Sequence, residues 1–141
     1  MHFVRFKAYG HENVIGEHTT TVEITTEDFL TKQGSCIVGV QATQKLSDLS
    51  SEIRELVSHE TTKIVLLMEV KGIREQVTGT GGNDLTYTDS TSMVARTSSF
   101  QCGRTLMVNA DKAASNLSRE FISLLTKTGI EMNCELHFIP E

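Results

Sequence analysis

Two histidines, His11 and His18, lie in the stretch GHENVIGEHTTTVEIT at residues 10–25. Neutral imidazole and carboxylate ligands suit zinc, manganese or iron, so with Glu17, Glu23 or a cysteine these rings can bind a divalent metal. The H-x6-H spacing matches no strong metal motif, however. The alternative is that one ring caps the turn and the other hydrogen-bonds within it. A divalent metal at His11 and His18 is therefore a hypothesis; otherwise the cofactor is unknown, and we assign no metal ligand set.

Glu23 lies on the polar face of an expected strand at 19–25, between Thr21 and Thr25. A carboxylate in this position can orient a histidine or act as a base. The competing interpretation is an ordinary exposed strand glutamate. For the neighbouring threonines, β-branched residues are common in strands, and propensity alone explains most of the run.

A second polar cluster lies in the stretch ARTSSFQCGRTLMVNADKAAS, where Arg96, Ser98, Arg104 and Lys112 together can bind a phosphate or carboxylate. Arg104 alternates with apolar residues, which predicts an apolar face and a buried partner for its guanidinium. Asp111 is expected to cap the following helix, where it competes with an anion for the first N–H groups. The alternative is that Arg104 pairs with an internal carboxylate and Lys112 is solvated.

These two clusters lead to a single-cleft hypothesis. One wall comprises His11, Asn13, His18 and Glu23, with His11, His18 and Glu23 as acid–base groups; the other comprises Arg96, Ser98, Arg104 and Lys112. Such a cleft suits a small anionic ligand, either a nucleotide or a phosphorylated or carboxylated metabolite. Whether the chain is an enzyme stays open. The alternatives are a non-enzymatic RNA- or protein-binding module and a structural homo-oligomer.

Composition narrows the class of protein. The chain has 141 residues, 38% of them hydrophobic, and a net charge of −5. This predicts one globular domain, residues 1–141, and disfavours RNA, which requires a basic face and stacking aromatics. No apolar run is long enough to cross a bilayer, so we expect no membrane partner. Cys36, Cys102 and Cys134 are expected to be buried, reduced thiols, which favours a cytoplasmic location.

The expected fold is α+β: a mostly antiparallel sheet that can curl towards a barrel, with two main helices packed on one of its faces. One helix is predicted from Ser47, its expected N-cap, and another from Asp111 to Gly129. Residues 63–70 predict a central strand covered on both faces, and the Gly-rich stretch at 79–84 predicts a hairpin turn. Residues 130–138 alternate cleanly, which predicts a half-exposed edge strand. No internal repeat is visible.

Several motifs taken together resemble a known family. They are GHENV, HTTTVEIT, LTKQGSCIVGV, Arg96-x-Ser98, Arg104-Thr105 and ADKAASNLSRE. In this order they resemble an archaeal family catalogued as domain of unknown function 371, from Phe3 to about Leu125. The resemblance implies an archaeal, cytoplasmic, single-domain protein and brings no established activity.

The family's polar motif positions fall on His11, Asn13, His18, Thr20, Glu23, Arg96, Ser98, Arg104, Asp111, Lys112, Arg119 and Glu120. The resemblance thereby adds Thr20 and Asp111 to the candidate ligand-binding residues. Two positions depart from the family pattern. Ser35 stands where an aspartate usually precedes the cysteine, and Thr97 where a lysine is usual, so both departures remove a charge.

Overall fold

The computed structural model describes residues 2–141, which form two four-stranded sheets. Sheet A is antiparallel throughout, and its strands lie in the order β1 (His2–Tyr9), β8 (Glu131–Ile139), β4 (Lys63–Val70) and β5 (Ile73–Thr80). Sheet B has the order β3 (Ile37–Gly39), β2 (Thr21–Thr25), β6 (Ser92–Arg96) and β7 (Thr105–Met107). Its central pair is antiparallel and both outer pairs are parallel.

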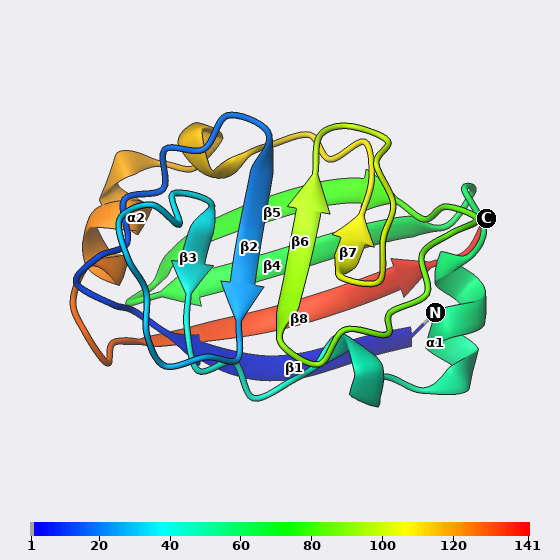
Figure 1. The fold of residues 1–141 in the computed structure, drawn as a ribbon, viewed down its shortest axis with the longest axis horizontal. Coiled ribbons are helices and arrows are strands. Elements are labelled where there is room, and N and C mark those ends of the chain that lie inside the picture. Colours follow the sequence, from blue (N-terminus) through cyan, green and yellow to red (C-terminus); the bar gives the residue numbers. More distant parts are fainter. Residues whose placement is uncertain (1) are drawn as a thin grey trace.

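The strands of sheet B run across those of sheet A, as in an orthogonal sandwich (Figure 1). Single bridges, Tyr9 to Val40 and Thr80 to Val108, join the sheets at two corners, and the sheets do not close into a barrel. The predicted α+β class with mostly antiparallel strands is confirmed. Instead of one curled sheet, there are two.

Each sheet directs alternate side chains into a shared core. Along β8 the side chains of Met132, Cys134, Leu136 and Phe138 are buried, which confirms the predicted inward set. The edge position predicted for this strand is wrong, because β8 pairs with β1 on one side and β4 on the other. Alternation of apolar and polar residues indicates that one face of the sheet is exposed to solvent. It does not indicate how many neighbouring strands the backbone pairs with.

Two short helical segments, each a 3₁₀ turn followed by an α-helix, close opposite ends of the sandwich (Figure 1). The first comprises η1 (Leu46–Asp48) and α1 (Ser51–Val57), the second η2 (Ala114–Asn116) and α2 (Arg119–Leu125). The expectation that both helices cover one sheet face is therefore wrong. The predicted starts were also wrong: the caps are Ser50 and Ser118, whose hydroxyls accept from Ile53 and Phe121 N–H.

The chain contains an internal structural repeat, which its sequence shows only around the two helical segments. The order long strand, short strand, shorter strand, 3₁₀ turn, helix, long strand occurs once from β1 to β4 and again from β5 to β8. Figure 1 shows the two sets related by a two-fold rotation, with α1 and α2 at opposite ends. The expectation of no repeat is wrong. Residues 40–56 and 108–124 share seven identical residues at a constant spacing of 68, whereas the strands of the two halves differ in sequence.

Matched hydrogen bonds establish the equivalence. Val40 N–H bonds to Tyr9 O in the first half, and Val108 N–H bonds to Thr80 O in the second. Gln41 and Asn109, which follow those two valines, both have positive φ, 55° and 53°. The repeats are also interleaved, since the first strand of each half pairs with the last strand of the other.

The segment after β5 differs from expectation. The predicted hairpin turn at 79–84 is not formed: β5 continues to Thr80, and residues 81–91 form a loop without a second strand. Gly81 and Gly82 fit here because a Cβ at Gly81 would overlap the carbonyl oxygen of Val57, which leaves no room for a side chain. The glycines thus allow this loop to pack tightly against the end of α1.

The matched caps give a test of the repeat. Ser50→Ala and Ser118→Ala should each lower the free energy of unfolding by about 1 kcal/mol, because each removes the acceptor for one first-turn N–H. Urea titration followed by circular dichroism measures both losses. Ser51→Ala, at an exposed helical position, is the control and should change little. Unequal losses at Ser50 and Ser118 would argue against energetic equivalence of the two halves.

Candidate functional site

The outer face of sheet B brings together residues from both predicted clusters. Val22 and Ile24 of β2 and Met93 and Ala95 of β6 lie in the core, so their alternate neighbours face outward. Thr21 lies directly opposite Arg96, and Glu23 follows two residues along β2 on the same face. Glu23 and Arg96, one from each predicted cluster, therefore lie on the same face of sheet B, and the single cleft stays a prediction.

Arg96 is half-buried and held in place by neutral partners. Its Nε donates to Thr105 Oγ1 at 2.9 Å, and its Nη2 lies 3.6 Å from Cys102 Sγ. Its guanidinium carbon stacks 4.9 Å from the ring centroid of Phe100. Among residues 2–141, no carboxylate lies within ion-pair distance of this guanidinium. The site thus carries a fixed positive charge without a balancing anion.

Cys102 lies in the same cluster. Burial opposes ionisation of its thiol, but the Thr105 hydroxyl, the Arg104 backbone N–H and the Arg96 guanidinium outweigh it and lower the pKa of Cys102. Thr105 Oγ1 already accepts N–H bonds from Arg96 and Cys102. Its own proton can therefore point to the sulfur, 3.6 Å away. These contacts make the Cys102 thiol more acidic than an ordinary cysteine.

Cys36 is also half-buried, in the turn directly before β3, but has the opposite electrostatic setting. Its Sγ donates to Glu23 Oε1 at 3.4 Å. Burial, together with the charge and hydrogen bond of Glu23, raises the pKa of Cys36 to about 11. The expectation of buried thiols thus holds for Cys134 alone, although all three cysteines are free.

Both histidines make turn-stabilising bonds through Nδ1. His18 Nδ1 accepts from the backbone N–H groups of Thr20 and Thr21, each at 3.2 Å, and His11 Nδ1 accepts from Asn13 N–H at 3.0 Å. The proton of each neutral ring is then on Nε2, which leaves no free basic nitrogen. In the second half, Asp89 caps Thr91 and Ser92 in the same manner. A general-base role for His11, His18 or Glu23 stays a prediction.

Three other predicted residues make hydrogen bonds with backbone groups around the site. Asn13 donates its side-chain amide to Leu30 O at 2.7 Å, which joins the first turn to the β2–β3 loop. Thr20 O accepts from both the backbone N–H and the hydroxyl of Thr97. Ser98 Oγ accepts from Phe100 N–H at 3.3 Å and so orders the loop that carries this ring. A ligand-binding role for each stays a prediction.

Asp111 and Lys112 bind to β5 and do not reach the Arg96 cluster. Asp111 Oδ1 accepts from Thr78 N–H, and it is not a helix cap, in contrast to the expectation. Lys112 pairs with Glu75 at 2.9 Å. Glu75 is largely buried, which opposes its ionisation, but Lys112 and Ser118 N–H outweigh that burial and lower its pKa. Both residues therefore join the second helical segment to sheet A.

Arg104 was predicted on an apolar face with a buried partner, and this is wrong. Its side chain is exposed because β7 begins only at Thr105, so Arg104 lies in the preceding turn. Arg119, another position of the family motif, donates to the carbonyls of Ala114, Leu117 and Ile15. Arg119 thus links the second helical segment to the turn before β2.

The structure shows no cluster of metal-ligating side chains among residues 2–141, where no three or more His, Cys, Asp or Glu side chains are grouped closely enough to hold an ion. The divalent-metal hypothesis at His11 and His18 therefore stays a hypothesis without a third ligand. Neither described α-helix has the length and apolar composition needed to cross a membrane.

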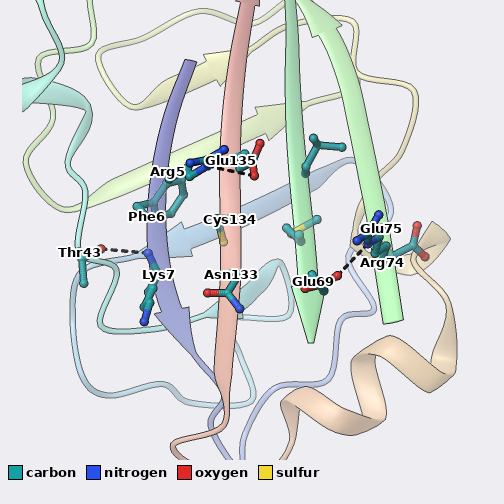
Figure 2. A pocket seen from close by; sticks show the side chains of 12 residues that line it. Arg5, Phe6, Lys7, Thr43, Glu69, Arg74, Glu75, Asn133, Cys134 and Glu135 are labelled. Carbon is teal, nitrogen blue, oxygen red and sulfur yellow. Dashed lines mark hydrogen bonds and ion pairs between the residues drawn. The ribbon is translucent and has the colours of Figure 1, made fainter. Parts of the chain in front are cut away.

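A separate hollow of about 740 Å³ lies on the outer face of sheet A, on the opposite side of the sandwich (Figure 2). Its cations already have carboxylate partners: Arg5 with Glu135 at 3.4 Å and Arg74 with Glu69 at 2.7 Å. An anion entering this hollow competes with those carboxylates. The hollow is thus a weaker candidate for anion binding than the unbalanced charge at Arg96.

Sequence reasoning missed Cys102, Thr105 and Phe100 as members of the cluster. The cluster forms because residues 97–104 leave β6 and return as β7, parallel to it, so that Thr105 lies beside Val94. No known sequence motif marks a loop this short that connects two parallel neighbouring strands. The one available signal was Arg96 itself, a charged residue at the end of an otherwise buried strand.

The matched turn caps predict how His18 responds to substitution. His18→Ala should lower the free energy of unfolding by about 1 kcal/mol, because two N–H groups lose their acceptor. His18→Asp should retain most of that stability, since Asp89 makes the same contacts in the other half. Chemical denaturation of the three proteins measures this. A loss for His18→Asp as large as for His18→Ala would contradict a capping role.

The contrasting thiols predict selective alkylation. Iodoacetamide should modify Cys102 first and at lower pH than Cys36, because the thiolate reacts and the pKa of Cys102 is lowered while that of Cys36 is about 11. Peptide mass spectrometry across a pH series measures both rates. Arg96→Gln should slow Cys102 selectively, and Arg74→Gln, on sheet A, is the control. Equal rates at Cys36 and Cys102 would contradict the assignment.

Comparison of the sequence with known proteins identifies the family of this chain. The family described as domain of unknown function (DUF371) matches residues 6–139. An uncharacterized protein of the archaeon Methanocaldococcus jannaschii is 43% identical over 132 residues, which cover 94% of this chain and 96% of that protein. The relative is archaeal, as the sequence resemblance implied. The chain belongs to the DUF371 family.

Proposed function

We propose that the protein binds a small anionic ligand, one that carries a phosphate or carboxylate, at Arg96 on the outer face of sheet B. The observation that carries the proposal is the half-buried guanidinium without a carboxylate partner among residues 2–141. Removing a charge from water is costly unless the charge is compensated, so such a site gains by binding an anion.

The guanidinium is oriented before a ligand arrives. Thr105 holds Nε and Cys102 lies against Nη2, so two positions of the planar group are fixed. Nη1 has no partner among residues 2–141 and keeps its donors for a ligand. Pre-organisation supports affinity because less side-chain entropy is lost when the anion binds.

Other polar groups on this face complete the proposed site. Thr21, directly opposite Arg96, supplies a hydroxyl, and Glu23 supplies a carboxylate that its thiol neighbour only partly satisfies. A ligand with both an acidic group and a hydrogen-bond donor would use Arg96 and Glu23 together. The proposed setting is the cytoplasm, where free thiols such as these stay reduced.

The proposal predicts loss of anion binding on removal of one charge. Arg96→Ala should weaken binding of inorganic pyrophosphate at least tenfold, because charge-assisted bonds to a guanidinium are the main attraction. Isothermal titration calorimetry at low ionic strength measures the affinity, and raising the salt should weaken it. Thermal unfolding of both proteins without ligand verifies that the variant is folded.

Arg74→Ala is the matched control, since it removes an arginine from the other outer face, where Glu69 already balances the charge. It should leave pyrophosphate binding unchanged. An equal loss in both variants would indicate a general effect of net charge. Unchanged binding in Arg96→Ala would remove the basis of the proposal.

A further inference from the structure

Phe100 is the exposed partner of the proposed anion site. Its side chain is 58% exposed although the guanidinium of Arg96 covers one ring face at 4.9 Å. The remaining exposure therefore belongs to the other ring face and the edge. The loop holds the ring by a bond from Phe100 N–H to Ser98 Oγ and by the return of the chain into β7. A large apolar surface thus lies beside a fixed cation.

The internal repeat provides a comparison within the same molecule. Phe29 occupies the matching position in the β2–β3 loop and is 61% exposed. The residue that matches Arg96 in the first half is Thr25, whose hydroxyl donates to Thr91 O, so Phe29 has no guanidinium beside it. The first half also has a cation–ring pair, Arg5 over Phe3 at 5.2 Å, but that guanidinium already pairs with Glu135. Among residues 2–141, Phe100 is therefore the exposed ring whose neighbouring cation has no carboxylate partner.

We infer that the ligand bound at Arg96 carries a planar aromatic ring beside its anionic group, as a nucleoside phosphate does, and that this ring stacks on the open face of Phe100. This inference rests on the proposed anion site and names its ligand class. Stacking on an aromatic side chain tolerates any base, because every base has a π-face. A single exposed Phe then favours aromatic anions over sugar phosphates without selecting one base.

The geometry also limits the size of the ligand. Arg96 and Phe100 are in direct contact, so the ring and the anion must be separated by a short linker such as one ribose. The outer face of sheet B supplies one such cation–ring pair, and the acidic chain offers no extended basic track. A mononucleotide therefore fits better than a nucleic acid strand, which requires successive cations and rings.

The test compares adenosine 5′-monophosphate with ribose 5-phosphate and pyrophosphate by isothermal titration calorimetry. Wild type should bind the nucleotide about tenfold more tightly than the sugar phosphate, in the range typical of base–aromatic stacking. Phe100→Ala should remove this preference, which is a ratio of two affinities measured on one variant, so that any change in how Arg96 binds the phosphate affects both ligands alike. Phe100→Trp should restore the preference, and Phe29→Ala should not change it.

The outcomes separate this inference from the proposed function. If pyrophosphate binds through Arg96 and Phe100→Ala keeps the nucleotide preference, the anion site stands and the stacking inference is wrong. If Phe29→Ala abolishes the preference as well, the ring position is wrong. If none of the three probes binds wild type, both proposals are overturned.

Discussion

The antiparallel ladder between β4 and β8 is the contact on which the rest of the fold depends. It joins the last strand of each half along the centre of sheet A, with Leu66 opposite Leu136 and Met68 opposite Cys134. These four side chains are buried, so the ladder and the core form together. The two remaining strands of sheet A then add across the halves, β1 to β8 and β5 to β4. Neither half can complete sheet A alone.

Sheet B is also built around a pair of strands from different halves, but its outer strands are arranged differently. Its centre is again a cross-half pair, β2 with β6, but each outer strand belongs to its own half and runs parallel. The loops that make these parallel returns lie at the edges of the outer face and carry Cys36 in one half and Cys102 in the other. The two thiols have unlike surroundings: Cys36, directly before β3, faces the carboxylate of Glu23, and Cys102, three residues before β7, lies beside the guanidinium of Arg96. A duplicated frame allows one face to be asymmetric in charge while its backbone stays symmetric.

The sequence predicted features that follow from which side chains are buried. It failed to predict features that depend on which strands pair. The inward set of β8 and the presence of two helical segments followed from alternation and helical spacing. The central position of β8 and the parallel returns depend on backbone partners far apart in the chain, which leave no local pattern. The repeat was missed for another reason, because only its helical segments are similar in sequence. Arg104 illustrates the same limit: its alternation suggested a strand face, yet β7 begins one residue later. The histidines looked reactive by type, and only the positions of Thr20, Thr21 and Asn13 reveal that Nδ1 is occupied.

Because the strands of the two halves pair with each other, the fold does not depend on which half comes first in the chain. His2 lies opposite Phe138, so the two outermost described strands meet side by side, just as Val70 lies opposite Ile73 where the turn Lys71–Gly72 joins the halves. A comparable short link between those outer ends, combined with a break at Lys71–Gly72, would yield a circular permutant with every strand neighbour preserved. The architecture is thus a closed cycle of two equivalent segments. Moving the chain break from one junction to the other would change the connectivity and leave the strand pairing of both sheets unchanged.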